Sequence, residues 1–125
     1  MNKKKALILF AHGARDPRWA QPFQKLQQLA QAQLPDAMVA LSFLELMEPR
    51  LPETVSQLVE SGCEQITIVP VFLGQGGHVL RDLPLLIDEL RVAYPTLNIA
   101  VSQAVGESPD VLNAMVAYCV ASLEH

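Results

Sequence analysis

Two histidines in this sequence follow apolar runs and lie beside glycines, an arrangement that can bind a ligand or a metal ion. His12 comes directly after residues 6–11, and His78 ends the glycine-rich segment 73–78, which follows another apolar run. Imidazole titrates near neutral pH and is a common ligand of divalent metals. Glycine backbone can approach a ligand closely because it carries no side chain. We therefore expect His12 and His78 to form one site.

A carboxylate completes this candidate ligand set. Glu45 follows the apolar run of residues 38–44. Two neutral imidazoles and one carboxylate suit divalent cobalt, nickel, iron or zinc. Simpler interpretations stay open, since His12 could cap a strand end and His78 could lie on an exposed loop without a ligand. Glu45 could be a solvated charge, as most surface carboxylates are.

Cationic and amide groups around the histidines predict an anionic substrate. Arg15 and Arg81 flank the two histidines, and a guanidinium pairs well with carboxylate or phosphate. Arg18 is a weaker candidate than Arg15 for binding such a substrate, because it could lie on the exposed face of a helix. Backbone amides of the glycine-rich segment can add an anion-binding nest. The residues that we expect to supply these amides are Gly74, Gly76 and Gly77.

The apolar pattern predicts an α/β fold. Four strand-like runs alternate with four segments of helical periodicity, which is typical of right-handed βαβ units and a parallel sheet with helices on both faces. We expect the strand order 2-1-3-4, water-facing glutamines on the first helix and an inward apolar stripe on the last. The predicted strands are residues 6–11, 38–44, 65–72 and 98–102. The helices are expected to start near residues 16–17, near 52, at 82 or slightly earlier, and near 109.

This topology brings the candidate site residues to one edge of the sheet. Ligands of such folds bind beyond the carboxyl ends of the strands, where the strand order reverses. The reversal falls between the first and third strands, which end close to His12 and His78. Glu45 ends the second strand, and neighbouring strands are about 4.8 Å apart. We therefore expect the three side chains to face one crevice.

Composition limits the class of protein. The chain has 125 residues, half of them apolar, and a net charge of −4, which argues against a nucleic-acid surface. We expect one domain over residues 1–122, with residues 123–125 resembling the start of a vector-derived tag. No segment is suited to span a membrane. Residues 6–11 are too short for the apolar part of a signal peptide, so we expect a cytosolic protein.

The two cysteines do not form a local metal or redox motif. Cys63 and Cys119 are far apart in the sequence, and each lies in an apolar helical context. Free Cys is among the most buried residue types. We expect both to be buried free thiols, with a disulfide or metal-binding pair as the alternative.

Several segments, taken together, resemble the class II chelatases of the CbiX type, which include sirohydrochlorin cobaltochelatases and the related ferrochelatases. The resemblance covers nearly the whole chain in the right order, and the combination is specific although each piece alone is weak. The segments that carry it are residues 12–17, residues 43–45 with Pro49, residues 69–73 with Gly77 and His78, and residues 82–84.

The resemblance implies a function. Members of the family insert a divalent metal into sirohydrochlorin, an anionic tetrapyrrole, in cobalamin-type biosynthesis and related pathways. His12 and His78 match the two histidines that hold the metal and accept pyrrole protons, and Glu45 matches an acidic position associated with metal. Cobalt is the metal favoured, with nickel or iron as alternatives. The resemblance further implies a lyase without an organic cofactor, and the chain's length resembles the short form, which works as a homodimer.

Other functions remain as alternatives at this point. ATP use is not expected, because no GxxxxGK[ST] loop is present. A metal or tetrapyrrole carrier of the same fold would share these residues, because fold does not fix function. A histidine phosphatase would require an arginine directly before His12, where this sequence has Ala11.

Overall fold

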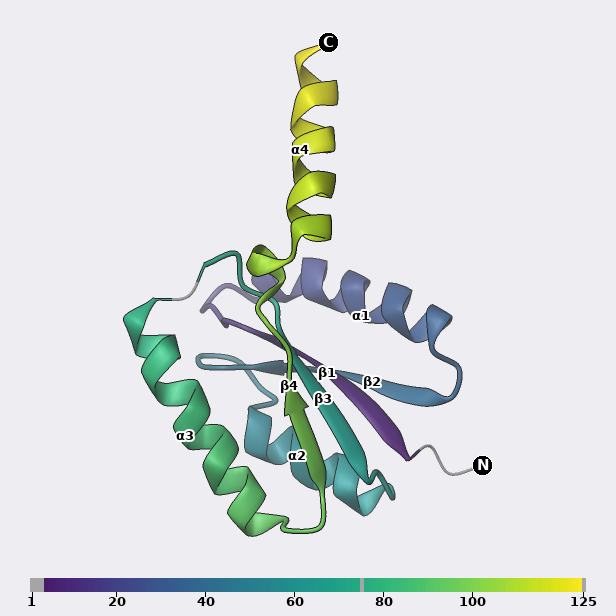
Figure 1. Cartoon of the computed structure of the whole chain (residues 1–125), viewed down its shortest axis with the longest axis vertical. Helices are drawn as coiled ribbons and strands as arrows, with labels where there is room; N and C mark the ends of the chain where they lie inside the picture. Colours follow the sequence, from purple (N-terminus) through teal and green to yellow (C-terminus); the bar gives the residue numbers. More distant parts are fainter. Residues whose placement is uncertain (1–3, 75, 125) are drawn as a thin grey trace.

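The protein forms one four-stranded parallel sheet with helices around it (Figure 1). The computed structural model describes residues 4–74 and 76–124, except for the side chains of residues 78 and 80. The strands are β1 (Lys5–Ala11), β2 (Ala37–Phe43), β3 (Gln65–Pro70) and β4 (Asn98–Val101). The helices are α1 (Gln21–Gln33), α2 (Leu51–Glu60), α3 (Gly77–Ala93) and α4 (Pro109–Leu123), with 3-10 turns η1 (Pro17–Ala20) and η2 (Val105–Glu107).

The strand order β2-β1-β3-β4 confirms the predicted topology. The central strands begin in register, with Lys5 opposite both Ala37 and Gln65. They also end close together, since Ala11 lies opposite Phe43 at the carboxyl edge. The loops that follow β1 and β2 therefore leave the sheet side by side.

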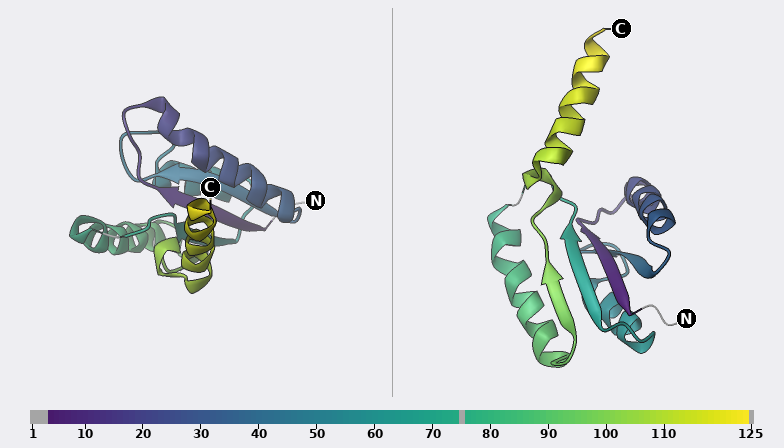
Figure 2. Two further views of the ribbon diagram at one scale, coloured as in Figure 1. Left: turned by 90° about the horizontal axis from the view of Figure 1, so that it is seen from above. Right: turned by 45° about the vertical axis from the view of Figure 1, so that its right-hand side comes forward.

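The core has two layers because strand side chains alternate between the faces of the sheet. Ile8, Phe10 and Ile68 are fully buried on the face covered by α2 and α3. Leu9 and Ala11 belong to a smaller cluster on the face covered by α1. Figure 2 shows α1 on one side of the sheet, with α3 on the other. The larger core thus packs the strands against α2 and α3. The carboxyl edge of the sheet is left for a site.

Glycine and proline positions predicted several element boundaries correctly. Ladder pairing of β3 ends at Pro70, which has no N–H to donate. Gly62 lies just past α2 with φ of 96°, the left-handed conformation expected at this position. Ser108 caps α4, and its side chain accepts a hydrogen bond from the N–H of Val111.

The start of α3 differs from the prediction. The helix begins at Gly77, five residues before Asp82, so that Gly77 and His78 belong to its first turn instead of a loop. Pro84 lies inside the helix. Proline is expected in the first turn of a helix and not in its interior. Pro84 is thus an exception to that preference.

Helix α4 also departs from the prediction. Its apolar residues were expected to pack inward, but α4 extends away from the sheet in Figure 1, and Val116 and Cys119 are exposed. Cys63 is buried as predicted, whereas the prediction for Cys119 was wrong. An apolar stripe predicts that a helix face is buried and does not specify the surface that covers it. Within the described part of the chain, no helix combines the length and apolar character needed to cross a membrane.

Two glutamines of α1 bind backbone instead of water. Gln27 donates to the carbonyl of Val39 at 3.0 Å. Gln31 donates to the carbonyl of Ala37 at 2.9 Å and accepts from the N–H of Val39 at 3.0 Å. β2 is an edge strand whose outer backbone groups have no strand partner. The two glutamines supply hydrogen bonds that a further strand would otherwise make.

Candidate active site

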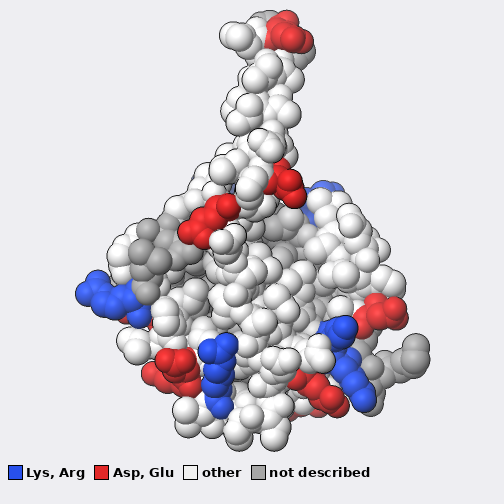
Figure 3. Space-filling view, in the orientation of Figure 1, with Lys and Arg blue, Asp and Glu red and all other residues white. Residues whose placement is uncertain are grey.

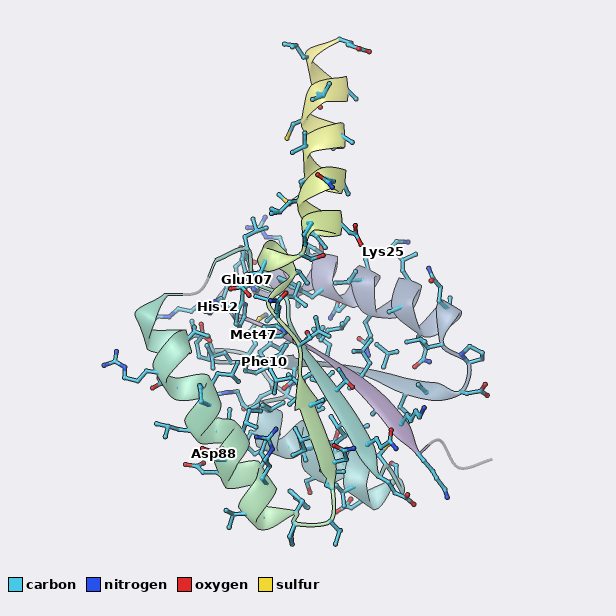
Figure 4. All side chains as sticks on the ribbon, viewed as in Figure 1. Phe10, His12, Lys25, Met47, Asp88 and Glu107 are labelled. Carbon is cyan, nitrogen blue, oxygen red and sulfur yellow. The ribbon has the colours of Figure 1, made fainter. Side chains whose placement is uncertain are left out.

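His12 and Glu45 come together at the carboxyl edge of the sheet. His12 directly follows β1 and Glu45 lies two residues beyond β2. Nδ1 of His12 is 3.2 Å from Oε1 of Glu45, and the side chains are 39% and 40% exposed. The imidazole also contacts the ring of Phe72, with centroids 4.6 Å apart. Figure 4 shows His12 at the upper ends of the strands.

Backbone contacts fix this pair. The N–H of Leu44 donates to the carbonyl of Ala11 at 2.8 Å, which continues the β1–β2 ladder into the loops. A Cβ at Gly13 would collide with the carbonyl oxygen of Glu45, so the two loops can meet only with glycine there. The indole N–H of Trp19 donates to the carbonyl of His12 at 2.7 Å. The carbonyl groups before and after the His12 N–Cα–C unit, those of Ala11 and His12, are therefore both fixed by hydrogen bonds.

The contact determines which imidazole nitrogen is free. A carboxylate only accepts hydrogen bonds, so Nδ1 of His12 donates to Glu45. A neutral imidazole then keeps its lone pair on Nε2, which is the usual arrangement of a histidine that binds a metal. Oε2 of Glu45 is buried and has no hydrogen-bond partner among the described residues. Because buried polar atoms normally have partners, this oxygen has bonding capacity left for an ion or a proton.

A cavity of about 410 Å³ adjoins the imidazole. This volume is within the roughly 300–1,000 Å³ of small-molecule sites. A second cavity, of about 350 Å³ between α3 and β4, contains none of the predicted site residues. The walls of the first cavity are mostly apolar or aromatic, and they are His12, Trp19, Phe23, Val71, Leu73 and Val105.

The arginines of this region fall into two groups. Arg18 forms an ion pair with Asp16, with Nη2 to Oδ2 at 2.6 Å, and its N–H donates to the same carboxylate, which caps η1. This pairing lowers the pKa of Asp16. Arg15 and Arg81 are exposed and make no ion pair or hydrogen bond with other described residues. Their guanidinium groups are thus available to a ligand. This agrees with the expectation that Arg18 is the weaker candidate for substrate binding.

The three glycines of the glycine-rich segment are open to solvent. Gly74, Gly76 and Gly77 are exposed, and a Cβ at any of them would meet no atom within 4 Å. No side chain caps the start of α3 at Gly76. The side chain of His78 lies outside the described residues, so its pairing with His12 stays a prediction. Within the described part, no three histidine, cysteine or acidic side chains are grouped as a metal site.

Comparison with known proteins assigns the chain to a family. The family model of CbiX matches residues 6–119. This protein belongs to the CbiX family. The sirohydrochlorin cobaltochelatase of Methanopyrus kandleri is 37% identical over 82 residues, which cover 66% of this chain and 57% of that protein. The sirohydrochlorin ferrochelatase of Bacillus subtilis is 27% identical over 112 residues, which cover 90% of this chain and 43% of that protein.

Solved structures support the same assignment. A CbiX protein of Marinobacter aquaeolei VT8, named for cobalamin (vitamin B12) biosynthesis, superposes with a TM-score of 0.85 at 32% identity, covering 96% of this chain and 98% of that one. The predicted resemblance to CbiX chelatases and the predicted fold are thereby confirmed. The chain spans about half the length of the curated relatives it matches.

Some residues of this CbiX site were missed by sequence reasoning. Trp19 was not among the predicted site residues, yet its indole N–H donates to the carbonyl of His12. Gly106 lies against Leu73, since its N–H donates to the carbonyl of Phe72 at 2.9 Å and a Cβ there would collide with Leu73. A glycine soon after the fourth strand was an available signal of such a close approach.

Proposed function

We propose that this CbiX-family protein inserts a divalent metal ion into sirohydrochlorin. The observation that carries this proposal is the His12–Glu45 pair at 3.2 Å beside an open, mostly apolar cavity. The matched relatives are named as sirohydrochlorin chelatases, and the pair lies where folds of this topology bind their ligands.

In the proposed reaction the incoming metal is a substrate. Nε2 of His12 binds the ion, and Glu45 orients the imidazole through Nδ1. The free Oε2 of Glu45 is available as a further ligand or as a temporary acceptor of a proton. His78, in the first turn of α3, is proposed as the second imidazole. Imidazole binds such ions less tightly than thiolate does, so the ion can be passed on to the ring.

Two pyrrole protons must leave as the metal enters the macrocycle. Histidine is a suitable base for this step, because its working range is near neutral pH. We assign this role to the same two histidines, each of which can accept a proton once its metal has been transferred. Arg15, Arg81 and the amides of the glycine-rich segment would bind the carboxylates of the substrate. The apolar cavity wall would contact the ring itself.

Cobalt is the metal we propose, with iron and nickel as the competitors. The relatives carry both cobaltochelatase and ferrochelatase names. Imidazole and carboxylate ligands accept all three ions. We further propose that the enzyme works without a nucleotide or an organic cofactor, in the cytosol, and as a homodimer. No observation in the structure favours the histidine phosphatase alternative.

The direct experiment follows metallation of sirohydrochlorin by absorbance in the presence of Co²⁺. We expect acceleration over the uncatalysed rate, and loss of that acceleration in His12→Ala and His78→Ala. Tight binding of metal or tetrapyrrole without acceleration would show a carrier instead. Competition among Co²⁺, Fe²⁺ and Ni²⁺ under anaerobic conditions measures the metal preference.

A further inference from the structure

A cavity of about 350 Å³ lies between α3 and the edge strand β4, and His12 is not among the residues that line it. The wall that α3 contributes is a row of residues at a spacing of four, which places their side chains on one face of the helix. Val79, Leu83 and Ile87 are the first three positions of this row, and all three are buried in the larger core. The volume is at the lower end of the roughly 300–1,000 Å³ of small-molecule sites. The cavity therefore offers an apolar floor to a small ligand.

Arg91 is the fourth position of the row and connects α3 to β4 at the cavity. Its Nη2 donates to the carbonyl of Ile99 at 2.9 Å. A guanidinium has five N–H donors. Arg91 makes no further hydrogen bond or ion pair with the described residues. The remaining donors are thus available to an anionic group, and a carboxylate matches their geometry.

Asp88 supplies the opposite charge at the same cavity. It lies three residues before Arg91, a spacing at which helical side chains can pair. The guanidinium of Arg91 is directed to β4 instead, and Asp88 forms no ion pair or hydrogen bond with the other described residues. Figure 3 shows acidic and basic groups on the surface formed by α3 and β4, and Figure 4 labels Asp88. Two opposite charges that do not neutralise each other are therefore available at one cavity.

The outer backbone of β4 adds uncharged hydrogen-bonding groups. Ser102 donates to the carbonyl of Ile68 in β3 at 2.9 Å. Backbone groups of successive residues in a strand point to opposite sides, so Val101 directs its N–H and C=O away from β3. Neither group has a hydrogen-bond partner within the described part of the chain. Because Val101 lines the cavity, a ligand there meets one free donor and one free acceptor of the strand.

We propose that this cavity binds a small zwitterion with an apolar side chain, of the α-amino acid class. The guanidinium of Arg91 pairs with the carboxylate of the ligand, and the carboxylate of Asp88 pairs with its ammonium group. The carbonyl of Val101 is a second acceptor for the ammonium group, which carries three N–H donors. The side chain of the ligand packs on the apolar floor. A ligand with only one of the two charges would leave one charge of the cavity unpaired.

Binding at this cavity has a consequence for the candidate active site. Val79 directly follows His78, and Pro70 ends β3, so the cavity wall begins where α3 leaves the glycine-rich segment. A ligand that joins α3 to β4 stabilises the position of this helix on the sheet and should raise the rate of metal insertion. This consequence rests on the proposed function, whereas the binding itself does not.

Isothermal titration of the full chain with L-leucine tests the proposal against matched probes. Isocaproate lacks the ammonium group, isopentylamine lacks the carboxylate, and glycine lacks the apolar side chain. A lost hydrogen bond to a charged group corresponds to about a tenfold loss of affinity or more. L-leucine should therefore bind at least about tenfold more tightly than either singly charged probe, and more tightly than glycine. Absence of L-leucine binding, or equal affinity for isocaproate, overturns the proposal.

Variants test whether L-leucine binds at this cavity. Asp88→Asn should weaken binding by about tenfold, and it should keep the fold because Asp88 is exposed and bonds no described residue. The matched control is Glu89→Gln, which removes a neighbouring exposed carboxylate that does not line the cavity. In backbone NMR the N–H of Val101 should shift with L-leucine, and that of Leu41 on the opposite edge strand should not. Equal affinity of Asp88→Asn and the unaltered protein overturns the proposal.

Metal-insertion kinetics separate this inference from the proposed function. L-leucine should raise the rate of the unaltered protein and of Glu89→Gln, and it should have little effect on Asp88→Asn. A protein that binds L-leucine but does not metallate sirohydrochlorin contradicts the proposed function and supports the cavity as a binding site. An unchanged rate at saturating L-leucine contradicts the coupling between the cavity and α3.

Discussion

Nδ1 of His12 and Oε1 of Glu45 lie 3.2 Å apart although 33 positions separate the two residues in the sequence. The distance is set by the sheet, since Ala11 and Phe43 are directly paired and the hydrogen bond from Leu44 to Ala11 extends that pairing into the loops. A contact supported in this way is preorganised before any ligand arrives. The imidazole is therefore oriented by the fold itself.

Replacing Glu45 by Gln should separate orientation from metal binding. The variant keeps a carbonyl oxygen that can accept from Nδ1 but removes the charge. Loss of such a supporting carboxylate typically costs about 10–100-fold in metal affinity or activity. We expect a loss in that range for metal insertion, smaller than the loss in His12→Ala. Steady-state kinetics and Co²⁺ titration measure both effects.

The control for this change is Glu64→Gln, which removes an exposed carboxylate paired with Lys4 at the opposite edge of the sheet. Its activity should match that of the unaltered protein. An unchanged metal affinity in Glu45→Gln would contradict the role assigned to Glu45.

The close approach at Gly13 predicts a different sensitivity for two glycines of the site region. A methyl group at Gly13 would collide with the carbonyl of Glu45, whereas one at Gly74 would meet open space. Forcing extra atoms into packed structure costs about 1–3 kcal/mol. Gly13→Ala should lower the free energy of unfolding by that amount in urea, and Gly74→Ala should leave it nearly unchanged. Equal stability of both variants would show that the loops can separate at no cost.

The sequence was sufficient to predict the sheet and the meeting of His12 and Glu45 at its carboxyl edge. Alternating strand and helix patterns, with the right-handed crossover rule, predict a parallel sheet and favour the order β2-β1-β3-β4. His12 and Glu45 then fall at one edge simply because each ends a strand. These predictions rest on the local periodicity of apolar residues, which one sequence shows directly, and on the handedness of βαβ connections, which is common to proteins.

The errors arise where a residue's partner is distant or ambiguous. Gln31 is a polar residue on a helix, and nothing in its position indicates that it bonds β2. Trp19 is a large apolar residue of η1, and nothing in its position indicates that its indole N–H donates to the carbonyl of His12. The apolar surface around Val116 requires burial, but the sequence does not specify which surface receives it. Periodicity identifies the face that is buried and leaves the partner undetermined.

Arg15 should contribute mainly to substrate binding. Its guanidinium has no partner among the described residues, whereas Arg18 is held by Asp16. One charge-assisted hydrogen bond lost at an exposed site corresponds to about a tenfold rise in KM. We expect Arg15→Ala to raise KM for sirohydrochlorin by about that factor, with little change in kcat. Lys4→Ala, at the opposite edge of the sheet, serves as the control and should leave KM unchanged.

The Asp16–Arg18 pair predicts how stability depends on acid pH. The hydrogen bond from Arg18 holds the pKa of Asp16 below its ordinary value of 3.8. A lowered pKa in the folded state means stability that is present above pH 3.8 and is lost as pH falls through the folded value. Asp16→Asn keeps a good capping residue without the charge. The two proteins should therefore differ in urea midpoint near neutrality and converge in acid; a constant difference across this range would contradict the assignment.

Gln31 should protect the free edge of β2 from association. It makes hydrogen bonds to Ala37 and Val39, groups that an added strand would otherwise bind. Removing a partner from such backbone groups costs about 1–3 kcal/mol and exposes an unpaired edge. We expect Gln31→Ala to lose stability in that range and to form aggregates on mild heating, as measured by light scattering. Gln28→Ala replaces an exposed glutamine on the same helix and should behave like the unaltered protein, because among the described residues only Gln27 and Gln31 of α1 donate to β2. Aggregation of both variants to the same extent would assign the effect to α1 as a whole and not to the edge contacts.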